Sequence, residues 1–208
     1  MRSIEALIES AERLTTNGLT QGEIADELNV SRETARWLVE QSGEQTTDAE
    51  TGSTPVDIHV DWSSVGRSGD RLAGLGGIMA DMLNATGDGA DLTVGIGNSG
   101  APLATVISQE LGTDFSVYIP SKYQQDGEDG SSTQGSFSRN FATIADRDCY
   151  IVDDNIDTGQ TMTETIEQIR EHRATPVAAV VLTDKLGQEE LAGVPVHSLI
   201  DMVQVGEK

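Results

Sequence analysis

The most constraining feature of this chain is an apolar segment that ends in two adjacent acids and a glycine-containing turn. Residues 149–163 read CYIVDDNIDTGQTMT. The apolar part predicts a buried strand that ends at Asp153 and Asp154, and residues 155–159 predict a turn before a helix. A helix that starts directly after a strand leaves unpaired N–H groups pointing at one place, which favours an anion there. The pattern therefore predicts an α/β unit with a phosphate site at this turn.

The side chains around the turn suit a phosphorylated polyol. Gly159 permits close approach of the backbone, and the hydroxyls of Thr158 and Thr161 can donate to a phosphate. The two carboxylates can accept hydrogen bonds from sugar hydroxyls. An ordinary strand–turn–helix without a ligand is the alternative interpretation. The residues expected to bind the ligand here are Asp153, Asp154, Asp157, Thr158, Gly159, Gln160 and Thr161.

A second glycine-rich turn, in residues 94–103 (VGIGNSGAPL), follows a predicted strand and precedes a helix expected from about Ala101 to Leu111. The two motifs together resemble type I phosphoribosyltransferases, in which two acids and a Thr-Gly-x-Thr loop bind phosphoribosyl pyrophosphate. Asp157 and Gln160 depart from the residues usual in that loop. The resemblance covers roughly residues 56–205, and it implies a pyrophosphate loop made of Gly97, Asn98, Ser99 and Gly100.

The remaining patterns of residues 56–208 fit the same fold class. Alternation in residues 56–62 predicts a half-buried strand, and apolar residues at helical spacing predict a helix through residues 72–83. Strand patterns at 115–119, 177–182 and 194–200 enclose a helical pattern at 161–172. Alternating strands and helices predict an α/β domain with a central, mostly parallel sheet.

The polar segment after the strand predicted at 115–119 bears on catalysis. Orotate phosphoribosyltransferases, which this domain resembles most, use a mobile loop rich in Lys and Arg that brings positive charge to the departing pyrophosphate. Residues 121–139 (SKYQQDGEDGSSTQGSFSR) keep Lys122 and Arg139 at the ends but place Asp126, Glu128 and Asp129 in the middle. Acids beside a developing pyrophosphate raise the barrier. We therefore expect transferase activity to be absent or vestigial, with Lys122 retained as a ligand donor.

The N-terminal residues have a different pattern. Residues 19–41 read LTQGEIADELNVSRETARWLVEQ, with a capping box at Thr20 and Glu23, a turn at Asn29 and a second helix capped by Ser31. This resembles the helix-turn-helix of bacterial and archaeal regulators, and a helical hairpin for protein contacts is the alternative. Trp37 either faces the DNA or packs inward. The residues that the resemblance places against DNA are Ser31, Arg32, Glu33, Arg36 and Trp37.

These sequence patterns predict three parts: a helix-turn-helix domain over residues 1–43, an exposed linker over 44–55, and a ligand-binding domain over 56–208. The linker (EQTTDAETGSTP, from residue 44) contains no large apolar residue.

The charge restricts the partners. The chain has 13 Lys and Arg against 35 Asp and Glu, a net charge of -22 spread along its length. This composition resembles that of salt-loving archaea, and an acidic mesophilic protein is the alternative. Phosphate attraction weakens in high salt, so base contacts and dimerisation must supply much of any affinity for DNA.

Several other classes are disfavoured. A single cysteine, Cys149, rules out an intramolecular disulfide, and the three histidines lack metal-ligand spacing. We expect a cytoplasmic protein with no signal peptide, membrane span or metal site.

The segments GEIADELNVSRETARWLVE, DIHVDW and VDDNIDTGQTMTE together resemble haloarchaeal regulators of glucose and fructose catabolism. That resemblance implies a dimeric regulator of central sugar catabolism that binds double-stranded promoter DNA. It also implies a phosphorylated sugar or sugar acid as effector, with 2-keto-3-deoxy-6-phosphogluconate as the candidate. No cofactor is then required, except Mg²⁺ if phosphoribosyl pyrophosphate is the ligand. An active orotate-type transferase and a regulator of nucleotide metabolism that senses phosphoribosyl pyrophosphate are the alternatives.

Overall fold

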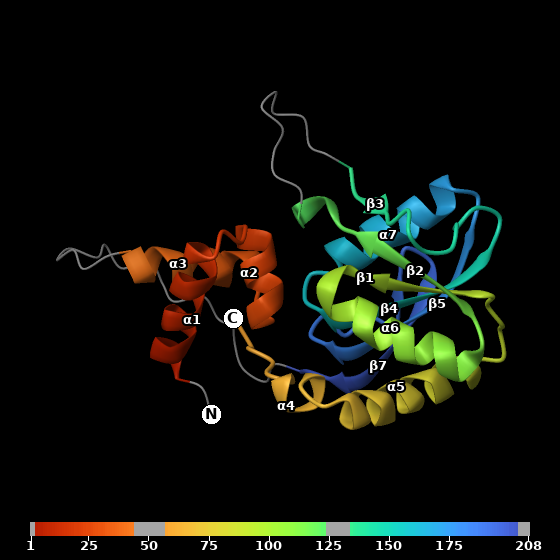
Figure 1. The fold of residues 1–208 in the computed structure, drawn as a ribbon, viewed down its shortest axis with the longest axis horizontal. Helices are drawn as coiled ribbons and strands as arrows, with labels where there is room; N and C mark the ends of the chain where they lie inside the picture. The colour runs from red at the N-terminus through yellow and green to blue at the C-terminus, as the bar shows by residue number, and fades with distance from the viewer. Residues whose placement is uncertain (1–2, 44–56, 124–133, 204–208) are drawn as a thin grey trace. The chain divides into compact units, whose positions relative to one another are not determined.

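A computed structural model describes residues 3–43, 57–123 and 134–203 (Figure 1). The chain forms two compact units, Met1–Trp62 and Ser63–Lys208. The predicted linker, residues 44–55, lies outside the described residues. The first unit runs on to Trp62, beyond the boundary predicted before Val56.

The first unit is built on three helices, α1 (Ile4–Thr16), α2 (Gln21–Leu28) and α3 (Arg32–Gly43). The predicted capping box of Thr20 and Glu23 is present at the start of α2, and Asn29 ends that helix in the left-handed conformation with φ 50°. Asparagine adopts this conformation more readily than other non-glycine residues, so the turn is tight. The side chains that form the core are Ala11, Ile24, Ala25, Leu28, Val30, Ala35 and Leu38.

The prediction of a strand at residues 56–62 is wrong for the described part, 57–62, which contains no strand. Its backbone and side chains bond to the turn between α2 and α3 instead of to a neighbouring strand. Ile58, which the alternation placed inward, is 39% exposed. An extended segment lying on a helical unit gives the same alternation as a strand, so the pattern alone could not separate the two.

The second unit is built on a sheet in the order β3-β2-β1-β4-β5-β7-β6. The five central strands are parallel, and β3 and β6 pair antiparallel at the edges. This confirms the predicted α/β class. The strands are β1 (Leu92–Ile96), β2 (Asp114–Ile119), β3 (Ser136–Phe137), β4 (Asp148–Ile156), β5 (Thr175–Asp184), β6 (Glu190–Leu191) and β7 (Val194–Asp201).

Helices cover both faces of the sheet (Figure 1). On one face, α5 (Gly69–Asn84) and α6 (Gly97–Leu111) pack against Tyr150 and Val152 of β4. On the other, α7 (Gln160–Glu171) packs against Cys149 and Ile151 of the same strand. Alternate residues of β4 therefore enter two different cores, as expected for a strand buried on both sides. A short helix, α4 (Ser63–Gly66), precedes α5.

Two boundaries differ from the predictions in ways that matter for the site. β4 continues to Ile156, so Asp153 and Asp154 lie within the strand and not at its end. α6 begins at Gly97, so the predicted loop of residues 97–100 is the first turn of the helix. Polar residues led the prediction to stop β4 early and to start α6 late. In the described parts of the chain, no helix is long and apolar enough to cross a bilayer.

Candidate functional site

The two predicted phosphate loops meet because the sheet reverses its strand order between β1 and β4. From β1 the chain passes through α6 to β2 on one side, and from β4 it passes through α7 to β5 on the other. β1 and β4 are paired neighbours, with Gly95 opposite Val152. Open α/β sheets bind ligands at the carboxyl ends of strands flanking such a point. The topology therefore brings residues 97–100 and 153–161 to one edge.

Gly100 permits a close contact between the two loops. A Cβ at this position would lie 2.5 Å from the carbonyl oxygen of Val152 and 3.2 Å from Oδ1 of Asp153. Only glycine lets the first turn of α6 approach β4 this closely. The position needs glycine for a packing reason that holds with or without a ligand.

The amino ends of the two helices at this edge share an unusual property. Hydroxyl side chains of Ser3, Thr20 and Ser68 cap α1, α2 and α5, and the Ser31 hydroxyl accepts from the Thr34 amide in α3. In contrast, α6 and α7 follow Ile96 and Gly159, and neither of these residues caps its helix with a side-chain hydrogen bond. Backbone N–H groups left uncapped at a helix start are available to an anion. Both of these uncapped starts lie at the carboxyl end of the sheet, after the neighbouring strands β1 and β4.

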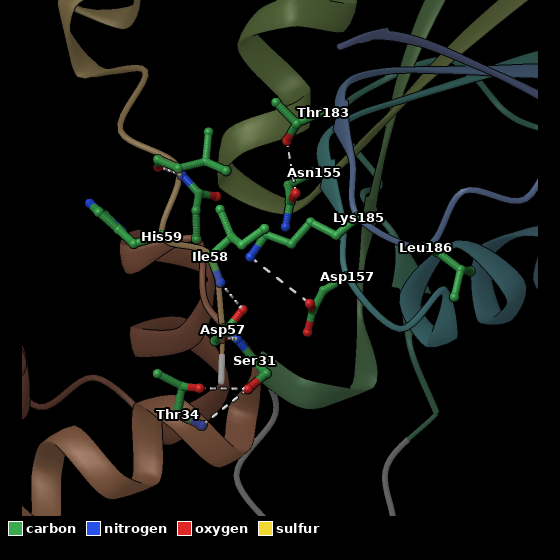
Figure 2. A network of polar contacts seen from close by, with 12 residues as sticks. Ser31, Thr34, Asp57, Ile58, His59, Asn155, Asp157, Thr183, Lys185 and Leu186 are labelled. Carbon is green, nitrogen blue, oxygen red and sulfur yellow. Dashed lines mark hydrogen bonds and ion pairs between the residues drawn. The ribbon is translucent and has the colours of Figure 1, made fainter. Parts of the chain in front are cut away.

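The turn before α7 combines a glycine with an ion pair to a buried lysine. Gly159 has φ 76°, and a Cβ there would lie 3.0 Å from Leu186. Just after β5, Lys185 directs its ammonium group to Oδ1 of Asp157 at 3.9 Å, as Figure 2 shows. The Lys185 side chain is only 7% exposed, against 27% for Asp157. A buried cation thus stands beside the predicted phosphate turn, where the exposed Thr158 and Gln160 flank Gly159.

Lys185 was not among the site residues predicted from the sequence. Its backbone amide donates to the carbonyl of Ile156 at 2.9 Å, so the pairing of β4 with β5 puts it beside the turn. The sequence offered one indication of its role, because lysine is rare in this chain and occurs only at Lys122, Lys185 and Lys208.

The two predicted sugar-binding acids are held differently. Asp154 is 6% exposed, whereas Asp153 is half-buried and accepts a hydrogen bond from the Asp154 amide at 2.9 Å. Beyond them, Thr183 of β5 donates to Oδ1 of Asn155 at 2.8 Å and fixes the end of β4 (Figure 2). Carboxylates are the ligands that Mg²⁺ prefers, usually together with phosphate oxygens of a substrate. A metal site made of protein ligands alone would need at least three His, Cys, Asp or Glu side chains close together. The described residues contain no such group.

Lys122 enters the region on a short 3-10 helix, Ser121–Tyr123, after β2. Its ammonium lies 5.4 Å from the centroid of the Tyr123 ring, and that ring lies across Gly97, where a Cβ would come within 2.6 Å of its hydroxyl. Glu164 on α7 holds this segment by accepting from the amide and the hydroxyl of Ser121, both at 2.9 Å. Residues 124–133, including the acids of the predicted catalytic loop, lie outside the described residues.

The predicted DNA-contacting residues occupy the start and one face of α3. Arg32, Glu33 and Arg36 are exposed, and Arg36 forms an ion pair with Glu40 at 2.8 Å. Ser31 caps the helix, and its hydroxyl also bonds to that of Thr34 at 2.9 Å. Trp37 is half-buried against the helical core, as the inward alternative predicted. α3 therefore presents two arginines to solvent on a helix whose other face is packed.

Residues 61–200 match the phosphoribosyl transferase domain family, so the second unit is a phosphoribosyltransferase domain. A protein of Haloarcula marismortui named "Transcriptional regulator GfcR" is 54% identical over 99% of this chain and 98% of its own length. Relatives of the same name are 51% identical in Haloferax volcanii, over 100% of both chains, and 45% identical in Methanosarcina mazei, over 99% and 100%. The chain belongs to the GfcR family.

Solved structures agree on the fold. An adenine phosphoribosyltransferase from Thermoanaerobacter pseudethanolicus superposes with a TM-score of 0.57 at 18% identity, covering 71% of this chain and 89% of that chain. The orotate phosphoribosyltransferase of Mycobacterium tuberculosis, in complex with inorganic phosphate, gives 0.54 at 18% identity, covering 70% and 80%. At this identity the likeness establishes the fold of the second unit and not its ligand.

Proposed function

We propose that this protein is a DNA-binding transcriptional regulator of central sugar catabolism that senses a phosphorylated sugar or sugar acid through its phosphoribosyltransferase domain. The observation that carries the sensing role is the pair of uncapped helix starts, Ile96 for α6 and Gly159 for α7, at one end of the sheet. The names of the relatives, transcriptional regulators of nearly the same length, support the regulatory role.

In this proposal a single phosphate binds the amides at the start of α7, with the hydroxyls of Thr158 and Thr161 adding hydrogen bonds. The carboxylates of Asp153 and Asp154 accept from the hydroxyls of the ligand. A ligand carboxylate needs a donor, and the amides of residues 97–100 or the ammonium groups of Lys122 and Lys185 are the candidates. 2-Keto-3-deoxy-6-phosphogluconate has all three kinds of group, so we choose it as the first ligand to test.

Phosphoribosyl pyrophosphate is the second candidate, because a diphosphate would use the start of α6 as well as that of α7. The acids of β4 would then share a Mg²⁺ with the diphosphate oxygens. Calorimetry against both ligands, with and without Mg²⁺, distinguishes the two. Thr158→Val should weaken whichever binding is observed. Binding that is unchanged in Thr158→Val would locate the effector elsewhere.

We further propose that the transferase reaction has been lost and that the protein acts as a homodimer on two half-sites. An assay with phosphoribosyl pyrophosphate, Mg²⁺ and orotate or a purine base tests the first point. Steady turnover would contradict it and favour an enzyme with an accessory helical unit.

DNA binding is tested with the protein's own upstream DNA, by fluorescence anisotropy at molar KCl. Arg32→Ala and Arg36→Ala should each weaken specific binding on the order of 1–3 kcal/mol. Arg173→Ala, an exposed arginine of the second unit, is the matched control for the loss of one positive charge. Equal losses for all three variants would remove α3 as the DNA-reading helix.

A further inference from the structure

The segment that follows the undescribed residues 44–56 is bound to the turn of the helix-turn-helix. We name residues 57–60 the strap. Oδ2 of Asp57 accepts a hydrogen bond from the backbone amide of Ser31 at 2.6 Å, and Nδ2 of Asn29 donates to the carbonyl of Val60 at 2.9 Å. Figure 2 shows the Asp57 carboxylate beside Ser31. The strap is therefore fastened to the residues that connect α2 to α3.

The Asp57 carboxylate is held in a fixed orientation. Its second oxygen, Oδ1, accepts from the amide of Ile58 at 2.7 Å. One oxygen is thus bound within the strap and the other at the start of α3. The Ser31 hydroxyl is already used, because it caps the helix through the Thr34 amide at 3.1 Å. A carboxylate consequently occupies a position at which a DNA phosphate would meet a helix start.

His59 of the strap has only one of its two ring nitrogens hydrogen-bonded among the described residues. Its Nδ1 bonds to the carbonyl of Leu28, and because a carbonyl only accepts, Nδ1 carries the proton. Its Nε2 is buried with no hydrogen-bond partner among the described residues. An unpaired buried ring nitrogen disfavours the bound arrangement, because water would satisfy it on release. The strap is thus held by specific hydrogen bonds, but the unpaired nitrogen of His59 lowers the stability of the bound state. This combination suits a contact that opens and closes.

We propose that the strap is an autoinhibitory contact, in which Asp57 competes with DNA phosphate for the start of α3 and must leave Ser31 before the helix engages its operator. The inference rests on the proposed DNA-reading role of α3. The strap is followed after two residues by Ser63, the first residue of the ligand-binding unit. A change in that unit on binding its ligand can therefore act on the strap through the chain itself.

The test compares the wild-type protein with Asp57→Asn, using its own upstream DNA at a fixed KCl concentration. Asparagine keeps an oxygen that can accept from Ser31 but removes the charge that opposes phosphate. Asp57→Asn should bind at least about threefold more tightly, given the usual size of a charge effect at a helix start. Glu9→Gln, an exposed acid on α1, removes one charge away from the strap and should change the affinity less than twofold.

His59→Ala is the second variant, because it removes the hydrogen bond from Nδ1 to the Leu28 carbonyl, one of the contacts that fasten the strap, without changing a carboxylate. It should also tighten binding, and circular dichroism establishes that both variants retain the helical content of the wild type. If the wild type binds and both variants bind equally or more weakly, the strap supports the helix-turn-helix and the autoinhibition proposal is wrong. If neither the wild type nor any variant binds DNA, the DNA-reading function of α3 itself fails.

Discussion

The hydroxyl of Tyr118, at the end of β2, donates to the carboxylate of Glu164 on α7 at 2.6 Å. Tyr118 is fully buried, and burial, followed by this hydrogen bond, raises the pKa of its hydroxyl. The same carboxylate accepts from Ser121, so one side chain on α7 joins the ends of two segments that flank the candidate site. Gly135, after the undescribed residues, lies so close that a Cβ there would be 2.6 Å from Glu164 Oε1.

Glu164→Ala should lower the free energy of unfolding by about 1–3 kcal/mol, because it leaves a buried hydroxyl and an amide without their acceptor. Urea unfolding at constant KCl measures this. Glu167→Ala, an exposed acid on the same helix, is the control and should change stability by no more than about 0.5 kcal/mol. Similar losses in both variants would show that the Tyr118–Glu164 contact contributes little.

Gly100→Ala should destabilise the protein by about 1–3 kcal/mol and weaken ligand binding, because the added methyl overlaps the backbone oxygen of Val152. Gly74→Ala is the matched control, since a Cβ at this position in α5 meets nothing within 4 Å. The control should stabilise the protein by about 0.5–1 kcal/mol, as alanine does inside a helix. Thermal unfolding separates the two, and a stable Gly100→Ala variant would refute the close packing of α6 on β4.

Lys185 and Asp157 should have opposite effects on effector binding. Lys185→Met removes the buried cation beside the phosphate turn and should reduce affinity about tenfold, the usual size of a lost charge-assisted hydrogen bond. Asp157→Asn removes a negative charge beside the ligand and frees the ammonium, so affinity should rise. Isothermal titration calorimetry gives both values. A fall in both variants would mean that the pair acts structurally and does not bind the ligand.

The thiol of Cys149 should not react in the folded protein. Burial raises its pKa to about 12, from an ordinary value of 9.0. Because the folded-state pKa is the higher one, the folded state retains the proton longer. The contribution of the protonated thiol to the free energy of unfolding is complete below pH 9 and is lost as the pH rises toward 12.

Urea unfolding of the wild type and Cys149→Ala between pH 8 and 11 tests the thiol prediction. Above about pH 9 the wild type should lose free energy of unfolding relative to Cys149→Ala, on the order of 1 kcal/mol per pH unit. Modification of the thiol at pH 8 at a rate equal to that of the unfolded chain would contradict the burial of Cys149.

Much of the fold could be predicted because its patterns are local. The helix-turn-helix follows from a capping box at Thr20, a left-handed Asn29 and apolar residues at helical spacing, each of which is a pattern among residues close in the sequence. The apolar run before Asp153 likewise predicted a buried strand. What failed was the interpretation of residues 56–62, because a strap and a strand have the same alternation.

Only part of the site could be predicted, because its residues are brought together by contacts between distant parts of the chain. The two glycine-rich turns could be paired only through resemblance, since their meeting depends on β1 lying next to β4. Lys185 and Glu164 are not visible as site residues in the sequence. Each is placed by a contact with a residue far away in the chain, Asp157 and Tyr118 respectively. Such contacts depend on strand register and helix packing, which no local pattern encodes.

The continuity of the strap with the ligand-binding unit has a thermodynamic consequence. If releasing Asp57 from Ser31 is what couples the two binding events, the coupling must be reciprocal. Whatever factor the effector imposes on the affinity for the operator, the operator must impose on the affinity for the effector. A promoter-bound molecule would then respond to a different range of metabolite concentration from one free in solution. The metabolite threshold of the switch would accordingly depend on how much operator DNA the cell contains.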